Sequence, residues 1–158
     1  MRKIFSLALF VLAVTTTVSA RGADNSLGTW KADVAKCKYT PAPWPVKNLT
    51  VTREAAPGGV NVTNKGMRTD GSAINASYTA KYDGSSSEVT GEGSPYDSIS
   101  VKQVDDSTFT YEAKNSKTKY RASGRIVISG GGKTMTATAS GVDANGNPMT
   151  LKLVYDKQ

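Results

Sequence analysis

From Lys47 to the C-terminus, the sequence repeats one pattern, in which a short segment of alternating apolar and polar residues is followed by a turn. The turns are rich in Gly, Asp and Asn, and they are Pro57-Gly58-Gly59, Thr69-Asp70-Gly71, Asp83-Gly84-Ser85, Asp105-Asp106-Ser107, Gly130-Gly131-Gly132 and Asn145-Gly146-Asn147. Residues of these types favour tight turns between strands. No segment shows sustained apolar residues at helical spacing. The pattern therefore predicts an all-β fold, either a sandwich or a barrel.

The turns divide the chain into ten strand candidates. The first is Gly28–Lys31, and the others are Lys47–Ala55, Gly59–Met67, Ala73–Tyr82, Ser87–Gly91, Ser98–Val104, Thr108–Asn115, Thr118–Ser129, Lys133–Val142 and Pro148–Asp156. After the first strand, Asp33 is suited to cap one helical turn over Val34–Lys38. The segment Thr40–Val46 holds three prolines, so it is expected to be an extended connector.

Alternation gives most of these strands one apolar and one polar face. In Ala73–Tyr82, for example, Tyr78 and Ala80 share one face, whereas Thr79 and Lys81 share the other. Strands of this kind joined by short links form an antiparallel meander. A meander of ten strands hides its edges best by closing on itself. We therefore predict an up-and-down antiparallel β-barrel of about ten strands.

The predicted inner face combines small residues with tyrosines. A barrel of ten strands that is lined in part by Ala leaves space for a ligand, because interior width grows with strand number. The alternative is a flattened barrel whose small residues let opposite walls touch. Of the two, we favour a cavity for a small apolar or amphipathic ligand. Its predicted lining residues are Tyr78, Tyr82, Tyr111, Tyr120, Leu153 and Tyr155.

The composition excludes several kinds of chemistry. The chain has 158 residues with no His and one Cys. Without imidazole, it has no Ser-His-Asp or Cys-His catalysis and no His-ligated zinc or haem. A lone Cys excludes internal disulfides, CxxC redox chemistry and thiolate metal cages. The sequence also lacks P-loop, GxGxxG and Gly-x-Ser-x-Gly motifs. We therefore expect no enzymatic activity, no catalytic residues, no metal site and no cofactor.

Residues 1–20 have the three parts of a signal peptide. Arg2 and Lys3 make a basic start, Ile4–Val14 is an apolar stretch of eleven residues, and Val18 and Ala20 occupy the small-residue positions before a cleavage site. The alternative, an uncleaved anchor, is disfavoured because the stretch is too short to span a bilayer. We expect a secreted or periplasmic protein whose single domain covers residues 21–158 and contains no integral membrane segment.

Cys37 has no possible partner within the chain. Free Cys is among the most frequently buried residue types, so we expect this thiol to be buried and inert. An intermolecular disulfide is the alternative.

A basic run lies in the second half of the sequence. Its members are Lys114, Lys117, Lys119, Arg121 and Arg125, with no acid among them. On a hairpin, Arg121 and Arg125 occupy the face opposite Tyr120. Binding of nucleic acid would need stacking aromatic residues on the basic face, and the pattern places none there, so we expect no nucleic-acid partner. The expected role is solvated outer charge, and a patch for anionic lipid or another polyanion is the alternative.

Several short motifs occur in one order along the chain: Gly28-Thr29-Trp30-Lys31, Ala35-Lys36-Cys37-Lys38-Tyr39, Ala80-Lys81-Tyr82-Asp83-Gly84, Lys133-Thr134-Met135-Thr136 and Val154-Tyr155-Asp156-Lys157-Gln158. Together they resemble the calycin group of barrels, which contains the lipocalins and the fatty-acid-binding proteins. More narrowly, the chain is similar to small secreted lipocalin-like bacterial proteins with no established activity.

This resemblance implies a structural role for Trp30 as a plug at the base of the barrel. It also exposes two departures. The Pro-rich segment Thr40–Val46 replaces the two-helix lid of the fatty-acid-binding proteins. Those proteins commonly hold a carboxylate with an Arg and a Tyr of the last strand; Tyr155 matches the Tyr, but Leu153 stands in place of the Arg.

Three classes of function are compatible with the sequence. The leading one is an exported, monomeric binding protein that holds a small apolar or amphipathic molecule inside the barrel. The second is an extracytoplasmic interaction or inhibitor protein that uses its loops or the basic hairpin, with the barrel as a scaffold only. The third, an enzyme without His, has no positive support. The presence of an internal cavity distinguishes the first class from the second.

Overall fold

In residues 23–158, the part of the chain that the computed structural model describes, every regular element is a β-strand. The strands are β1 (Gly28–Ala32), β2 (Lys38–Thr40), β3 (Val46–Ala56), β4 (Gly59–Arg68), β5 (Ala73–Lys81), β6 (Asp83–Glu88), β7 (Thr90–Glu92), β8 (Ser98–Asp105), β9 (Thr108–Lys114), β10 (Arg121–Ser129), β11 (Thr134–Val142) and β12 (Pro148–Lys157). The prediction of an all-β fold is confirmed.

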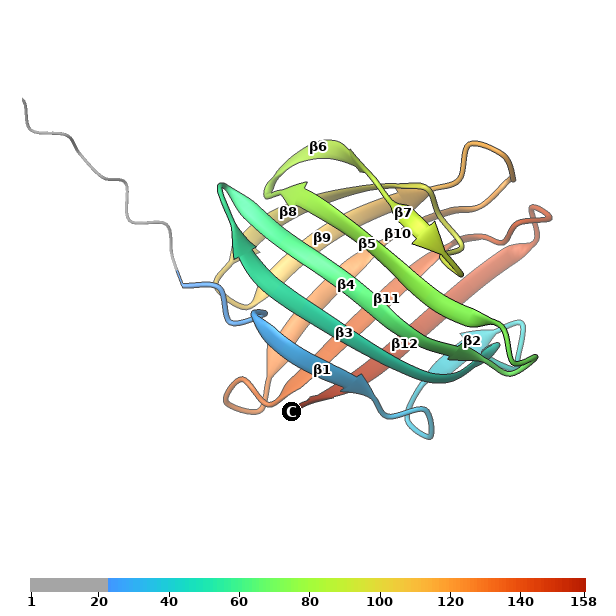
Figure 1. The fold of residues 1–158 in the computed structure, drawn as a ribbon, viewed down its shortest axis with the longest axis horizontal. Helices are drawn as coiled ribbons and strands as arrows, with labels where there is room; N and C mark the ends of the chain where they lie inside the picture. The colour runs from blue at the N-terminus through green and yellow to red at the C-terminus, as the bar shows by residue number, and fades with distance from the viewer. Residues whose placement is uncertain (1–22) are drawn as a thin grey trace, which may run out of the picture.

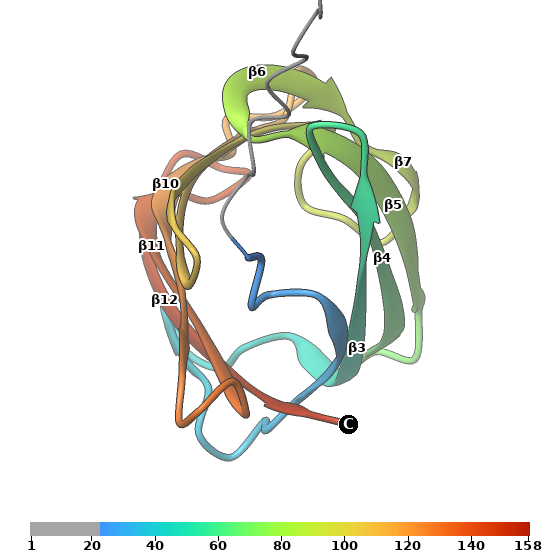
Figure 2. The ribbon, with the colours of Figure 1, turned by 90° about the vertical axis from the view of Figure 1, so that its left-hand side faces the viewer.

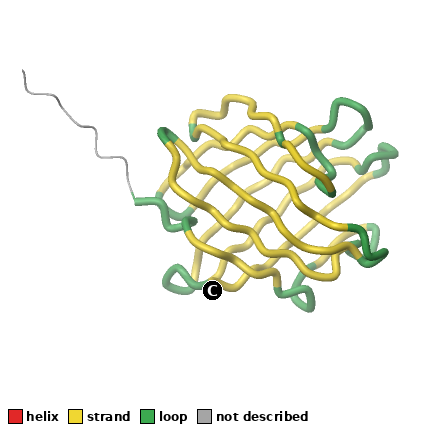
Figure 3. Tube along the Cα trace, in the orientation of Figure 1, coloured by secondary structure: helices red, strands yellow, loops and turns green. Residues whose placement is uncertain are grey.

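The strands form one antiparallel sheet that curls into a nearly closed barrel (Figures 1 and 2). Their order is β6-β8-β9-β10-β11-β12-β1-β3-β4-β5-β7, and β2 adds to the edge of β12 beside this path. Most neighbours in the sheet are also neighbours in sequence. One exception is β1, which lies between β12 and β3, with Trp30 paired to Lys157 on one side and to Val51 on the other. The others are β6 and β7, which pair with β8 and β5. The connecting loops gather at the two ends of the barrel (Figure 3).

The seam of the barrel is crossed by one extended segment, residues 83–92. Its first part, β6, pairs with β8 through Ser86 and Ser100, and its second part, β7, pairs with β5 through Thr90 and Ser77. Between the two parts, the half-buried Val89 packs against the core. The segment therefore pairs first with β8 at one edge of the sheet and then with β5 at the other, and these pairings bring the two edges together.

One local expectation was wrong and another holds in part. The predicted strand Ser87–Gly91 is divided between β6 and β7, because the segment changes partner at Val89. The helical turn expected over Val34–Lys38 is a single, shorter turn in which the amide of Cys37 donates to the carbonyl of Asp33 at 3.2 Å. The turn ends before Lys38, because Lys38 already belongs to β2, which pairs with β12. With β2, the number of strands in residues 23–158 is twelve.

Alternation divides the barrel wall into an apolar inner face and a polar outer face, as predicted. Along β5, Ile74, Ala76, Tyr78 and Ala80 are buried, whereas the residues between them are exposed or half-buried. The largest fully buried side chains are Trp30 and Phe109, each 0% exposed. They occupy one end of the interior, and the core at this end is the more densely filled.

No helix in residues 23–158 is both long and apolar enough to cross a membrane. The predicted signal peptide of residues 1–20 and its cleavage site before residue 21 lie outside the described residues.

Candidate ligand-binding cavity

The barrel contains a cavity of about 520 Å³. Its walls are mainly apolar because the inward positions of the strands carry aliphatic and aromatic side chains. The aliphatic lining comes from both halves of the chain and includes Leu49, Val51, Val62, Ile74, Ile99, Ile126, Met135, Met149, Leu151 and Leu153. A volume of this size lies within the range of small-molecule sites. The flattened barrel with touching walls is therefore not what the chain forms.

Tyrosine side chains line the same cavity. Tyr78, Tyr111, Tyr120 and Tyr155, which alternation placed on the inner face, are all part of its wall, and so is the predicted Leu153. Within the described residues, no buried polar side-chain atom lacks a hydrogen-bond partner. The hydroxyls of Tyr111, Tyr120 and Tyr155 form no hydrogen bond with these residues, so they must reach free space in the cavity. Each is a polar group available to a ligand.

These phenols are protonated at neutral pH, and burial extends this protonation to more alkaline pH. It raises the pKa of Tyr120 to about 12, and it raises the pKa values of Tyr111 and Tyr155 further still. At neutral pH the hydroxyls are therefore neutral and can donate or accept a hydrogen bond.

Arg53 is the charged residue at the floor of the cavity. Its side chain is only 3% exposed, and it is part of the cavity lining. The Nε atom donates to Ser26 Oγ at 2.9 Å, and one terminal nitrogen lies 3.5 Å from the Tyr82 hydroxyl. The guanidinium also lies over the ring of Phe109, 5.6 Å from its centroid. Arg53 therefore joins the filled end of the barrel to the open cavity.

The charge of Arg53 has no direct carboxylate partner. Within residues 23–158, the one ion pair closer than 4.0 Å joins Lys36 to Asp33. These two residues lie in the turn after β1 and do not line the cavity. Asp24 is connected to Arg53 through hydroxyls only. The Ser26 hydroxyl donates to Asp24 Oδ1 at 2.6 Å, and the Tyr82 hydroxyl donates to the other carboxylate oxygen.

The same network seals the barrel end. Trp30 Nε1 donates to the carbonyl of Ser26 at 2.8 Å, and Lys157 covers the Trp30 ring with its Nζ 5.1 Å from the centroid. Trp30 is thus completely buried in a plug, as the structural role predicted for it requires.

Tyr82, which we predicted in the cavity lining, lies in this plug instead. Tyr82 points inward like Tyr78 and Ala80 of β5, but it lies just beyond the end of the strand, beside the filled part of the core. Its ring packs on Phe109 at a centroid distance of 5.1 Å. Burial, together with the hydrogen bond to Asp24, raises the pKa of Tyr82 to about 12.

The opposite end of the cavity is lined by loops. The connector before β3 contributes Trp44 and Pro45, and the loop between β7 and β8 contributes Tyr96. The Tyr96 ring stacks on Tyr120 at 6.1 Å between centroids, and Arg68 holds this loop by donating to the carbonyl of Gly93 at 2.6 Å. The cavity is therefore bounded by these loops at one end and by Arg53 at the other.

Several of these residues were not predicted. Arg53 was recognisable, because alternation along Lys47–Ala55 places it on the same face as Leu49 and Val51. Trp44 and Tyr96 lie in loops, and nothing in the local sequence indicates that they turn toward the barrel.

The predicted basic run is distributed over the outer surface. Lys114 and Arg121 are paired neighbours on β9 and β10, Lys117 and Lys119 lie in the loop between these strands, and Arg125 lies farther along β10. All five are exposed. They do not form one continuous patch by themselves.

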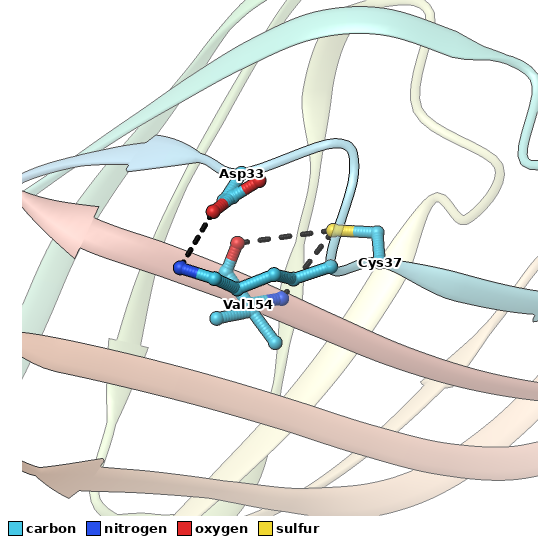
Figure 4. A network of polar contacts seen from close by, with 4 residues as sticks. Asp33, Cys37 and Val154 are labelled. Atoms are coloured by element: carbon cyan, nitrogen blue, oxygen red, sulfur yellow. Dashed lines mark hydrogen bonds and ion pairs between the residues drawn. The ribbon is translucent and has the colours of Figure 1, made fainter.

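Cys37 lies outside the cavity and is half-buried against β12 (Figure 4). Its Sγ accepts from the amide of Val154 at 3.4 Å and lies 3.7 Å from the Val154 carbonyl oxygen. Burial raises the pKa of the Cys37 thiol. In the same part of the chain, Asp33 and Lys36 form their ion pair at 2.7 Å. Among the described residues, no group of three or more His, Cys, Asp or Glu side chains is placed to hold a metal ion.

No protein-family model matches this chain, and no curated protein matches its sequence. The function therefore has to be inferred from the cavity itself.

Proposed function

We propose that this protein binds a small amphipathic molecule inside the barrel, with an anionic end group held at Arg53 and an apolar body toward the loops. The observation that carries the proposal is the guanidinium of Arg53, which is 3% exposed, lines the cavity and lacks a carboxylate within 4.0 Å in the described part of the chain. The resemblance of the sequence to calycins supports the same interpretation. We also propose that the protein is exported and acts as a carrier without enzymatic activity.

A buried guanidinium without a close counter-ion is costly, because the charge has lost its hydration. The hydroxyls of Ser26 and Tyr82 compensate only in part, since Asp24 is reached through them and not directly. A ligand carboxylate or phosphate at the cavity floor would complete the pairing. Hydrogen bonds between Arg and such anions are shorter and stronger than neutral ones, and they are often bidentate. Tyr78, which shares the floor with Arg53, offers a further hydroxyl.

The rest of the cavity suits an apolar body. Val51, Val62, Ile99 and Ile126 surround the space above Arg53, and burial of alkyl groups against such walls contributes about 0.8 kcal/mol for each CH₂. The hydroxyls of Tyr111, Tyr120 and Tyr155 allow polar substituents along the body. The site therefore favours a molecule with one anionic end over a fully apolar one.

Paired probes test this proposal: dodecanoate and 1-dodecanol have the same alkyl length but differ in charge. We expect wild type to bind dodecanoate more tightly. In Arg53→Met, dodecanoate affinity should fall by about 1.5–3 kcal/mol, or roughly 12- to 160-fold, because a hydrogen bond to a charged group is lost. Affinity for 1-dodecanol should change much less. Isothermal titration calorimetry measures both.

Lys157→Met is the matched control, because it removes a cation at the same barrel end but outside the cavity. It should leave both affinities unchanged. If neither probe binds wild type, the cavity is not a ligand site. If Arg53→Met weakens both probes equally, Arg53 has only a structural role.

A further inference from the structure

The pairing of strands aligns four cations on the outer wall of the barrel. Lys102 of β8 pairs with Thr110 of β9, which pairs with Arg125 of β10. Arg125 pairs with Thr138 of β11, Thr138 with Lys152 of β12, and Lys152 with Lys38 of β2. We name this line the cationic row; it consists of Lys102, Thr110, Arg125, Thr138, Lys152 and Lys38. Only one of its cations belongs to the basic run seen in the sequence.

All the side chains of the row point away from the cavity, because their strand neighbours point into it. Phe109 and Ile126 are buried, and Tyr39, Leu151 and Leu153 line the cavity. The four cations themselves are exposed. The row is therefore an outer surface, separate from the proposed ligand site.

The cations of the row are not neutralised by close acids. None of them has a carboxylate within 4.0 Å among residues 23–158. Asp105 is near enough for Arg125 to help lower its pKa, but this carboxylate accepts the amide of Ser107 at 2.9 Å. Asp83 pairs with Lys102 in register, and its carboxylate accepts the amide of Ser85 at 2.9 Å. Both carboxylates keep their negative charge, but neither lies within 4.0 Å of a cation of the row.

The spacing of the row is regular. Neighbouring strands lie about 4.8 Å apart, so cations on every second strand are separated by roughly 9.6 Å and the row extends over about 24 Å. Lys38, on the strand next to β12, ends the series. The adjacent line on the same face supplies hydroxyls through Ser100, Ser123, Ser140 and Thr150, with Glu112 as its one acid.

The opposite wall of the barrel has no comparable series. The line through Lys65 runs from Lys31 of β1 through Thr50, Lys65 and Asn75 to Glu92, and Lys31 also pairs with Asp156 of β12, so two cations are matched by two acids. The line through Asn61 contains Glu54 and Thr79. Positive charge is therefore concentrated on one wall.

We propose that the cationic row binds a linear acidic polysaccharide that lies across the strands. A flexible chain can follow the curved wall, with its anionic groups on the cations and its hydroxyls on the Ser and Thr side chains between them. A planar membrane could touch only part of a curved row, and the row offers no large apolar side chain for insertion. Single-stranded nucleic acid needs stacking aromatics, which the row also lacks.

The test uses heparin as the probe and two variants of equal net charge. In the row variant, Lys38, Lys102, Arg125 and Lys152 are all replaced by Gln. In the control variant, the exposed Lys47, Lys65, Lys81 and Lys133, which lie off the row, are replaced by Gln. We expect the row variant to bind heparin roughly tenfold more weakly or worse, because four exposed ion pairs are lost together. The control variant should bind nearly as wild type does.

Binding is measured in the full chain at physiological salt, with circular dichroism to verify the fold of each variant. The proposal is overturned if wild type does not bind heparin, or if both variants weaken equally, since total charge would then explain the effect. It is also overturned if single-stranded DNA or vesicles of anionic lipid bind wild type more tightly than heparin does. Because the row lies outside the cavity, the row variant should retain dodecanoate binding, which separates failure here from failure of the proposed function.

Discussion

The two ends of the barrel are built in opposite ways. At the closed end, Trp30 and Phe109 are fully buried, and Arg53, Ser26 and Tyr82 are tied together by hydrogen bonds. In the cavity, the hydroxyls of Tyr111, Tyr120 and Tyr155 have no partner within the described residues, and at its open end loops bearing Trp44 and Tyr96 form the rim. Polar groups are thus satisfied internally at one end and left available at the other.

This difference indicates how one small barrel separates stability from binding. A filled, hydrogen-bonded plug contributes to stability whether or not a ligand is present. Unfilled volume and unpaired hydroxyls reduce packing, but they are what a ligand needs. Arg53 lies at the boundary, since it belongs to the hydrogen-bond network of the plug and also faces the cavity.

The largest expected effect is loss of stability at alkaline pH. An unfolded tyrosine releases its proton near pH 10, whereas burial raises the pKa of Tyr120 and of Tyr82 to about 12. Between these values the folded protein holds more protons than the unfolded chain, so stability is complete below pH 10 and falls as the pH rises toward 12. Several buried tyrosines act together. Urea unfolding at a series of pH values measures the slope.

The change of stability with pH can also be compared between the two ends of the barrel. The double variant Tyr111→Phe and Tyr120→Phe should reduce this pH dependence more than Tyr82→Phe does, because the cavity holds more of the tyrosines whose pKa is raised. A stability that stays constant up to pH 12 would show that the tyrosines are less buried than described.

The next largest effect is expected from the two tryptophans. Trp30→Ala removes a fully buried ring and its hydrogen bond to Ser26 and should lower the free energy of unfolding by about 3–5 kcal/mol. Trp44→Ala, at the half-buried rim, should cost less than about 1 kcal/mol. Chemical denaturation measures both. Equal losses would mean that the rim is as important for stability as the plug.

A smaller effect is expected from single hydroxyls. Tyr82→Phe removes the donor to Asp24 and should lower stability by about 1.5–3 kcal/mol, the usual range for a hydrogen bond to a charged group. Tyr120→Phe removes a hydroxyl without a partner in the described chain, and stability at neutral pH should remain unchanged or rise slightly. A loss in Tyr120→Phe as large as that in Tyr82→Phe would contradict the contrast between the two ends.

The smallest effect is expected on ligand affinity when one hydroxyl of the cavity is removed. Tyr155→Leu keeps the bulk apolar but deletes one hydroxyl, so amphiphiles with a polar substituent should bind about 0.5–1.5 kcal/mol more weakly. Purely apolar dyes should change less. Fluorescence titration with both kinds of probe measures the difference. Equal changes would mean that the hydroxyl does not face the ligand.

Most of the barrel could be predicted from local sequence, because alternation and turn residues act over a few positions only. Segments such as Gly59–Met67 and Lys133–Val142 are strands within one residue of the predicted limits. The exchange of partners at Val89 could not be predicted, since it depends on β5 and β8 approaching each other. The same holds for β2, whose pairing with β12 joins residues more than a hundred positions apart.

The candidate site shows the same limit. Tyr78, Tyr111, Tyr120 and Tyr155 follow from alternation alone, whereas Tyr82 points inward as alternation predicts but lies at the filled end of the barrel, against Phe109. The loop of Tyr96 is placed by a long-range contact between Arg68 and Gly93. The cationic row requires the register of six strands, so no local pattern could have related Lys38 to Lys102.

The position of β1 between β12 and β3 also sets an order of events in time. β1 emerges from the ribosome before β12, so one edge of β1 stays unpaired until residues 148–157 have been made. The barrel therefore closes at β1 only after β12 has emerged. If the ends of the chain were linked and a new break were made at Ser85, within the crossing segment, β7 would lie near the start of the chain and its partner β5 near the end. The closure between distant strands would then move from β1 to the seam, so a different pair of strands would close the barrel last.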